Sequence, residues 1–132
     1  MASFLQYCLP GSPSLYYGDE AGMEGYNDPF NRRTYPWGRE DKEILEHFRR
    51  LGHLRKSNTA LRTGSIRFFQ ANNQQVGFTR SCEGQNLRIY VNRGGDHWEI
   101  PAGKVLFAHN LQTVAHDGMC LAPMGYCIVE DE

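Results

Sequence analysis

The chain has 132 residues, of which 40% are hydrophobic and 22% charged, and its formal net charge at pH 7 is −1. This length allows one domain, or a small domain plus a piece of another, and it excludes a complete (β/α)8 barrel, which needs about 250 residues. The near-neutral charge provides no basic stripe for nucleic acid. No apolar run reaches the roughly 18 residues that a membrane-spanning helix needs, so no membrane partner is predicted.

The first forty residues predict a helix end, a short strand and a long loop. Residues 1–9 are typical of the last turns of a helix, which Pro10 and Gly11 would end. Ser14–Tyr17 is a short apolar run between Pro13 and Gly18, and this pattern predicts a buried parallel strand. Residues 18–39 show no periodicity, and an irregular loop of this length is usually functional.

Residues 41–57 predict an amphipathic helix, with acidic residues early and basic residues late, as the helix dipole favours. Apolar residues recur in it at helical spacing, namely Ile44, Leu45, Phe48, Leu51 and Leu54.

From residue 65 onward the pattern changes to short strands separated by turn signals. The predicted strands are Ser65–Gln70, Gln75–Cys82, Leu87–Asn92, His97–Ile100, Lys104–His109, Met119–Ala122 and Tyr126–Glu130. The turn signals are Asn72-Asn73, Glu83-Gly84, Gly94-Gly95, Ala102-Gly103 and Asp117-Gly118. Several short strands at this spacing predict an antiparallel sandwich or barrel. The chain is therefore expected to be mostly β, with a boundary at about residues 58–64.

The sequence predicts no metal site and no cofactor. No two of the four cysteines form a C-x2-C pair, and the five histidines form no ligand-spaced pair. The cysteines are Cys8, Cys82, Cys120 and Cys127. Reduced, buried thiols are the default expectation, and they weakly favour a cytoplasmic location, although a signal peptide upstream of a partial chain would not be visible.

Four motifs in order along the chain resemble glycoside hydrolase family 13, the α-amylase family. Tyr16-Tyr17-Gly18-Asp19-Glu20 with Gly22-Met23 resembles its eighth barrel strand and following loop. Asp28-Pro29-x-Asn31-Arg32-Arg33 with Pro36-Trp37 is similar to the neopullulanase and cyclomaltodextrinase branch. Leu54-Arg55-Lys56 to Gly64 looks like the end of the eighth helix, and Pro123-x-Gly125-Tyr126 resembles the closing strand of the C-terminal domain.

The resemblance implies two units within the chain. Residues 1–60 would be the C-terminal fragment of a (β/α)8 catalytic barrel, comprising the last strand, the long loop and the last helix. Residues 61–132 would be the α-amylase-type C-terminal β-sandwich, which braces the barrel. The intact parent would be a retaining glycosidase acting on α-glucans such as starch, maltooligosaccharides or cyclodextrins.

The resemblance also implies that this chain contains no catalytic residue. Retaining glycosidases need two carboxyl groups about 5–5.5 Å apart. In this family they come from barrel strands four, five and seven, and no matching motif is present here. The fragment alone is therefore expected to be inactive.

Substrate binding is the role that the resemblance does transfer to this chain. Asp28 and Arg32 occupy the positions of an Asp and an Arg that hydrogen-bond sugar in the neopullulanase branch. A carboxylate acceptor and a guanidinium donor fork suit vicinal sugar hydroxyls. The alternative is that Asp28 caps the turn at Pro29 and pairs with Arg32 only to hold the loop.

Two aromatic groups are further candidates for sugar stacking. Trp37 with Tyr35 could stack on sugar rings, although family analogy favours Trp37 as a packing anchor at the start of the helix. Trp98, Tyr90 and Phe107 could form a platform on the sandwich, but alternating strands usually bury such side chains.

Two other functions stay open. The chain could be a non-catalytic carbohydrate-binding β-sandwich module, or a structural remnant without a ligand. Without neighbouring barrel elements, residues 1–40 would expose apolar surface and strand edges. This segment is therefore expected to fold onto the sandwich in a non-barrel arrangement or to self-associate with another copy.

Overall fold

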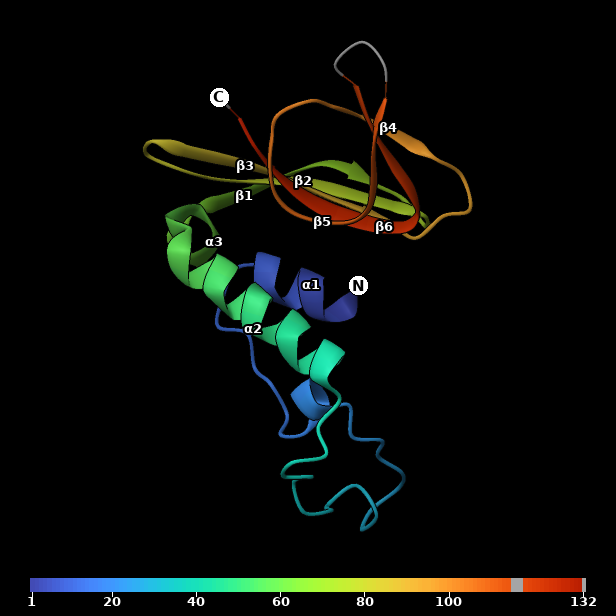
Figure 1. The fold of residues 1–132 in the computed structure, drawn as a ribbon. Coiled ribbons are helices and arrows are strands. Elements are labelled where there is room, and N and C mark those ends of the chain that lie inside the picture. Colours follow the sequence, from blue (N-terminus) through green and yellow to red (C-terminus); the bar gives the residue numbers. More distant parts are fainter. Residues whose placement is uncertain (115–117, 132) are drawn as a thin grey trace.

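In the computed structural model, which describes residues 1–114 and 118–131, helices cover one face of an antiparallel sheet (Figure 1). The helical elements are α1 (Ala2–Cys8), the 3-10 turn η1 (Asp19–Ala21), α2 (Lys42–Ser57) and α3 (Thr59–Thr63). The strands are β1 (Ser65–Ala71), β2 (Gln75–Cys82), β3 (Gln85–Asn92), β4 (Trp98–Pro101), β5 (Lys104–Val114) and β6 (Gly118–Glu130). The structure confirms that the chain is mostly β and that strands begin at residue 65. It also confirms the two predicted helices, because α1 and α2 lie within the ranges 1–9 and 41–57.

The long strand β6 organises the sheet, whose order is β1-β2-β3-β6-β4, with β5 paired along β6. The second half of β6 pairs with β3, from Leu87↔Glu130 to Val91↔Tyr126. Its first half pairs with β4, from Trp98↔Leu121 to Pro101↔Gly118. Two predicted strands, Met119–Ala122 and Tyr126–Glu130, are thus one strand, because β5 pairs along both halves.

Residues on the two halves of β6 pack in one apolar cluster together with β3, β4 and β5. Tyr90 and Val129 come from one layer of this cluster, and Ile100 and Leu121 come from the other. The sheet therefore folds over itself as a sandwich. The buried Asn92 stabilises the fold, since its amide donates to the Leu121 carbonyl at 3.0 Å and to the Asp96 carbonyl at 2.7 Å. The predicted turn at Asp117-Gly118 involves Asp117, which lies outside the described residues.

The second apolar cluster joins the helices to the sheet. Phe4 of α1 is completely buried, with its ring 4.6 Å from Tyr126 and 5.7 Å from Phe107. Leu51 and Leu54 of α2 belong to the same cluster. Helix α1 therefore packs on the sandwich, whereas most residues from 10 to 40 are exposed and none of them belongs to this cluster.

The strand predicted at Ser14–Tyr17 is wrong in this structure. The segment has no regular secondary structure, and Leu15, Tyr16 and Tyr17 are 38%, 56% and 42% exposed. A β-strand needs a hydrogen-bonded neighbour, and no described segment pairs with these residues.

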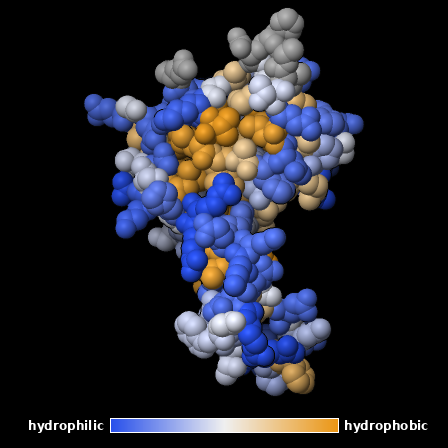
Figure 2. Space-filling view, viewed as in Figure 1, coloured by the Kyte–Doolittle hydropathy of each residue, from blue (hydrophilic) through white to orange (hydrophobic). Residues whose placement is uncertain are grey.

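Figure 2 shows how hydrophobic and hydrophilic residues are distributed on one face of the molecule. Hydrophobic side chains gather over the sandwich on the face shown, whereas the narrower part below it, with α2 and the loop, is mostly hydrophilic. Among the described residues, no helix is both long and apolar enough to cross a membrane.

Candidate functional site in the loop before helix α2

The loop between η1 and α2 is fixed at its two ends. At its start, the Met23 amide donates to the Gly18 carbonyl at 2.9 Å, and Gly18 adopts the left-handed conformation, with φ of 95°. At its end, the Asp41 amide donates to the carbonyl of buried Ala21 at 3.0 Å. Asp41 also caps α2, because its Oδ1 accepts from the amides of Glu43 and Ile44, both at 3.0 Å. The middle of the loop is thereby held as an exposed projection.

Asp28 and Arg32 lie together in the middle of this loop. The Phe30 amide donates to the Asn27 carbonyl at 2.9 Å, and the Arg32 amide donates to the Pro29 carbonyl at 3.1 Å. These turns place Nε of Arg32 2.7 Å from Oδ1 of Asp28. Both side chains are exposed, at 59% for Asp28 and 71% for Arg32. The structure thus pairs the two residues that the sequence singled out and leaves both open to solvent.

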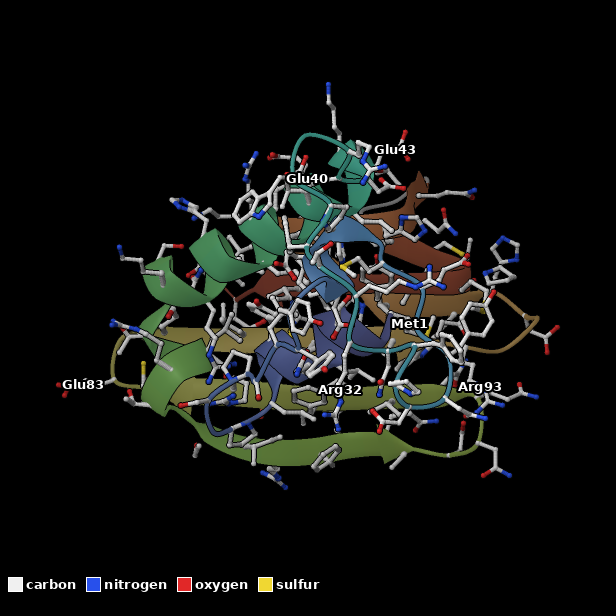
Figure 3. All side chains as sticks on the ribbon, turned by 90° about the horizontal axis from the view of Figure 1, so that it is seen from below. Met1, Arg32, Glu40, Glu43, Glu83 and Arg93 are labelled. Carbon is white, nitrogen blue, oxygen red and sulfur yellow. The ribbon has the colours of Figure 1, made fainter. Side chains whose placement is uncertain are left out.

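Figure 3 places this pair relative to the rest of the molecule. Viewed from below, Arg32 lies in front of the sheet, and Glu40 lies near the start of α2. Glu83 and Arg93 lie toward opposite sides of the view, at the two ends of β3.

The neighbouring loop residues are held by a few polar contacts. The Tyr17 hydroxyl donates to the Arg33 carbonyl at 2.7 Å, and the Arg33 guanidinium lies 5.7 Å from the centre of the Tyr26 ring. Glu20 accepts a hydrogen bond from the Gly18 amide at 3.0 Å. Glu20 therefore bonds a loop amide in this structure.

Two loop groups have shifted pKa values with local causes. Loss of hydration, followed by the nearby Glu20 carboxylate, raises the pKa of Tyr35. Hydrogen bonds from the backbone of Glu40 itself and of Gly38 lower the pKa of the Glu40 carboxyl. The loop surface therefore presents carboxylates and an un-ionised phenol at neutral pH.

The aromatic candidates separate into two different environments. Trp37 is 81% exposed and lies 4.5 Å from the ring of Tyr35, so the expectation that it packs as an anchor is wrong here. Tyr90 belongs to the cluster inside the sandwich, whereas Phe107 belongs to the cluster under the helices. These two rings are buried on opposite faces, which confirms their role in packing and rules out a common platform with Trp98.

Within residues 1–114 and 118–131, no cluster of three His, Cys, Asp or Glu side chains is placed to hold a metal ion. The four cysteines are free. Burial raises the pKa of the Cys8 and Cys127 thiols to about 12. Both are therefore protonated at neutral pH and are poor ligands or nucleophiles.

One feature that sequence reasoning missed is a groove between α2 and the sandwich. Its volume is about 660 Å³, and Arg50, Lys104 and Phe107 are among the residues that line it. The Arg50 guanidinium lies 4.7 Å from the centre of the Phe107 ring. Because the groove joins segments far apart in the chain, no local motif could have indicated it.

Comparison with known proteins supplies relatives for part of the chain. It is 46% identical to an amylopullulanase of Thermoanaerobacter thermohydrosulfuricus over 80 residues, or 61% of this chain and 5% of that protein. It is 37% identical to a cyclomaltodextrinase of Geobacillus thermopakistaniensis over 100 residues, or 73% of this chain and 17% of that protein. No protein-family model matches.

Solved structures of glycan-degrading enzymes share the fold. A debranching enzyme from Nostoc punctiforme superposes with a TM-score of 0.83 and 28% identity, covering 97% of this chain and 30% of that structure. The chain is therefore related to enzymes of the α-amylase family of glycoside hydrolases, over a part of their length.

The α-amylase family relationship covers both regions of the chain, because the superposition includes the loop, the helices and the sandwich. The chain spans only about a twentieth to a third of the relatives that it matches. The activity of those relatives thus belongs to proteins that are several times longer than this chain.

Proposed function

We propose that the chain is the C-terminal part of a retaining α-glucan hydrolase, without catalytic carboxylates of its own. Residues 1–60 would belong to the catalytic barrel, and residues 61–132 would form the sandwich that braces it. The named relatives support the α-glucan assignment, since they include an amylopullulanase and a cyclomaltodextrinase.

The exposed pair of Asp28 and Arg32 is the observation that supports a sugar-binding role for the loop. Nε of Arg32 holds the carboxylate at 2.7 Å, and the terminal nitrogens of the guanidinium are additional donors. The second carboxylate oxygen of Asp28 is an additional acceptor. Such a pair can hydrogen-bond adjacent sugar hydroxyls without either residue moving far, so little ordering energy is lost on binding.

The first test is whether the chain alone releases reducing sugar from maltoheptaose, β-cyclodextrin or pullulan during a long incubation. We expect no release above buffer. Clear release would overturn the proposal, because the chain would then contain its own pair of catalytic carboxylates.

The second test replaces the matching segment of the Geobacillus cyclomaltodextrinase with this chain. We expect the chimera to hydrolyse β-cyclodextrin. In it, Asp28→Ala or Arg32→Ala should raise KM about tenfold or more, whereas the exposed Arg39→Ala should leave KM unchanged. If the chimera is folded and both substitutions leave KM unchanged, Asp28 and Arg32 do not bind substrate.

A further inference from the structure

Strands β1 and β2, together with Asn86 at the start of β3, line a surface hollow that the proposed function does not use. It has a volume of about 460 Å³, and the residues that line it include Ser65, Arg67, Phe69, Thr79, Ser81 and Asn86. This volume falls within the range of about 300–1,000 Å³ that is usual for small-molecule sites. We refer to it as the β1–β2 hollow.

Phe69 is held in place at the β1–β2 hollow. The register between β1 and β2 shifts between Phe68 and Gln70, so Phe69 is the extra residue of a β-bulge. Its ring covers Gly77, where an added Cβ would come within 2.3 Å of ring atom Cε2. The ring also lies 5.4 Å from Tyr90 in an edge-to-face arrangement. Any residue other than glycine at position 77 would displace the ring.

One side of the Phe69 ring therefore packs on the sheet, and 48% of the residue remains exposed. A rigid, partly exposed aromatic face attracts the C–H groups of a ligand, because the ring face is electronegative. Since the ring is already ordered, binding does not have to immobilise it.

The polar side chains around Phe69 are of the kinds that bond sugar hydroxyls. Arg67 is exposed and lies two residues before Phe69 on the same strand. Thr79 and Ser81 add hydroxyl groups from β2, and the Thr79 hydroxyl donates to the Arg67 carbonyl at 3.4 Å. Asn86 adds an amide that also hydrogen-bonds Ser81 and Asp131. Hydroxyl oxygens can accept as well as donate, so these groups retain capacity for a ligand.

We infer that the β1–β2 hollow binds a short stretch of an α-glucan chain, with Phe69 stacking on a glucose ring and Arg67 bonding its hydroxyls. The chemistry alone indicates a neutral polyhydroxyl ligand, since the site combines one aromatic face with several donors and acceptors. The choice of α-glucan rests on the proposed function. This site lies on the sandwich and is separate from the loop pair of Asp28 and Arg32.

The test titrates the isotope-labelled 132-residue chain with maltoheptaose and follows backbone amide shifts by NMR. We expect saturable shifts at Arg67–Phe69, Thr79–Ser81 and Asn86. Phe69→Ala and Arg67→Ala should each weaken binding about tenfold or more. Phe69→Trp keeps an aromatic face of larger area and should restore binding.

The controls separate recognition from loss of structure. Arg62→Ala removes another exposed arginine, in α3, and should not change the affinity. Unfolding curves check that each variant is folded. Cellohexaose, whose glucose units have β linkages, should bind more weakly than maltoheptaose if the hollow fits the curvature of an α-glucan.

Each outcome decides a separate question. Shifts confined to the loop around Asp28 and Arg32, or no saturable shifts at all, would overturn the inference while leaving the chimera test of the proposed function intact. Binding at the hollow together with an inactive chimera would support the site and count against the proposed function. Loss of binding in Phe69→Ala without recovery in a folded Phe69→Trp would overturn the stacking of Phe69 on a glucose ring.

Discussion

Two regions of this chain use the same residue types in opposite ways. In the helix-covered sandwich, Phe4 is completely buried, whereas in the loop Phe30 is 63% exposed. One apolar cluster lies inside the sandwich and the other joins it to the helices, and the loop contributes no residue to either. The comparison shows that the buried apolar contacts lie inside the sandwich and between it and the helices, whereas the loop is exposed.

The arginines show the same contrast. Arg80 is fully buried and donates to the Cys8 carbonyl at 2.6 Å and the Gly64 carbonyl at 2.9 Å. Arg55 donates to the Tyr7 carbonyl at 2.6 Å and to the Leu9 carbonyl at 3.0 Å. These guanidinium groups satisfy carbonyls at the C-terminal end of α1, where the helix dipole also favours cations. Arg32, in contrast, faces solvent.

The largest effect that would test this contrast is the removal of Phe4. Phe4→Ala deletes a ring that packs against Phe107 and Tyr126, so it should destabilise the chain by about 3–5 kcal/mol. Urea unfolding followed by circular dichroism measures the change. Because α1 is short, we expect it to separate from the sheet in this variant.

Phe30→Ala is the matched change in the loop. Its side chain is mostly exposed, so the free energy of unfolding should change by no more than about 0.5 kcal/mol. An equal loss in the free energy of unfolding for the Phe4→Ala and Phe30→Ala variants would show that the loop is part of the core. It would contradict the contrast between a buried sandwich and an exposed loop.

A smaller effect should appear in the pH dependence of stability, through His47 on α2. Burial, followed by the positive charges of the N-terminal amine, Arg50 and His109, lowers the pKa of His47 below its usual value of 6.5. The unfolded state then binds more protons than the folded state at mildly acidic pH. The stabilising contribution is complete above pH 6.5 and is lost as the pH falls from there toward the lowered folded pKa.

Urea midpoints measured from pH 8 to pH 5.5 test this expectation. His47→Gln removes the titrating group and retains a hydrogen-bonding partner for Ser3, whose hydroxyl lies 3.0 Å from Nε2 of His47. The variant should show a flatter pH profile than the parent chain. If the pH dependence of the urea midpoint is the same in His47→Gln as in the parent chain, a group other than His47 causes it.

Local patterns predicted most of the fold because they depend on neighbouring residues. Helical spacing identified α2 to within a residue of its start, and the turn signals on either side of β2 gave its range as Gln75–Cys82, which is the observed one. A family motif singled out Asp28 and Arg32 as sugar-binding residues, and the ion pair that the structure shows between them is the contact that the alternative interpretation described.

Features that depend on distant partners could not be predicted in this way. The sequence predicted two strands, Met119–Ala122 and Tyr126–Glu130, yet β5 pairs with both segments and β6 is one continuous strand. Ser14–Tyr17 had strand-like composition but no neighbour to pair with. The Phe69 bulge depends on the register with β2, which the composition of β1 does not encode.

The smallest predicted effect concerns the Asp28 and Arg32 pair. Exposed ion pairs contribute about 0–1 kcal/mol, because solvent screens the charges and both side chains must be ordered. Asp28→Asn keeps the shape of the side chain and should change the free energy of unfolding by no more than about 0.5 kcal/mol. The rate of tryptic cleavage in the loop, after Arg32, Arg33 or Arg39, should also remain the same. If cleavage instead accelerated strongly, the pair would be holding the loop in place, and the proposal that its exposed polar groups serve sugar binding would lose its structural basis.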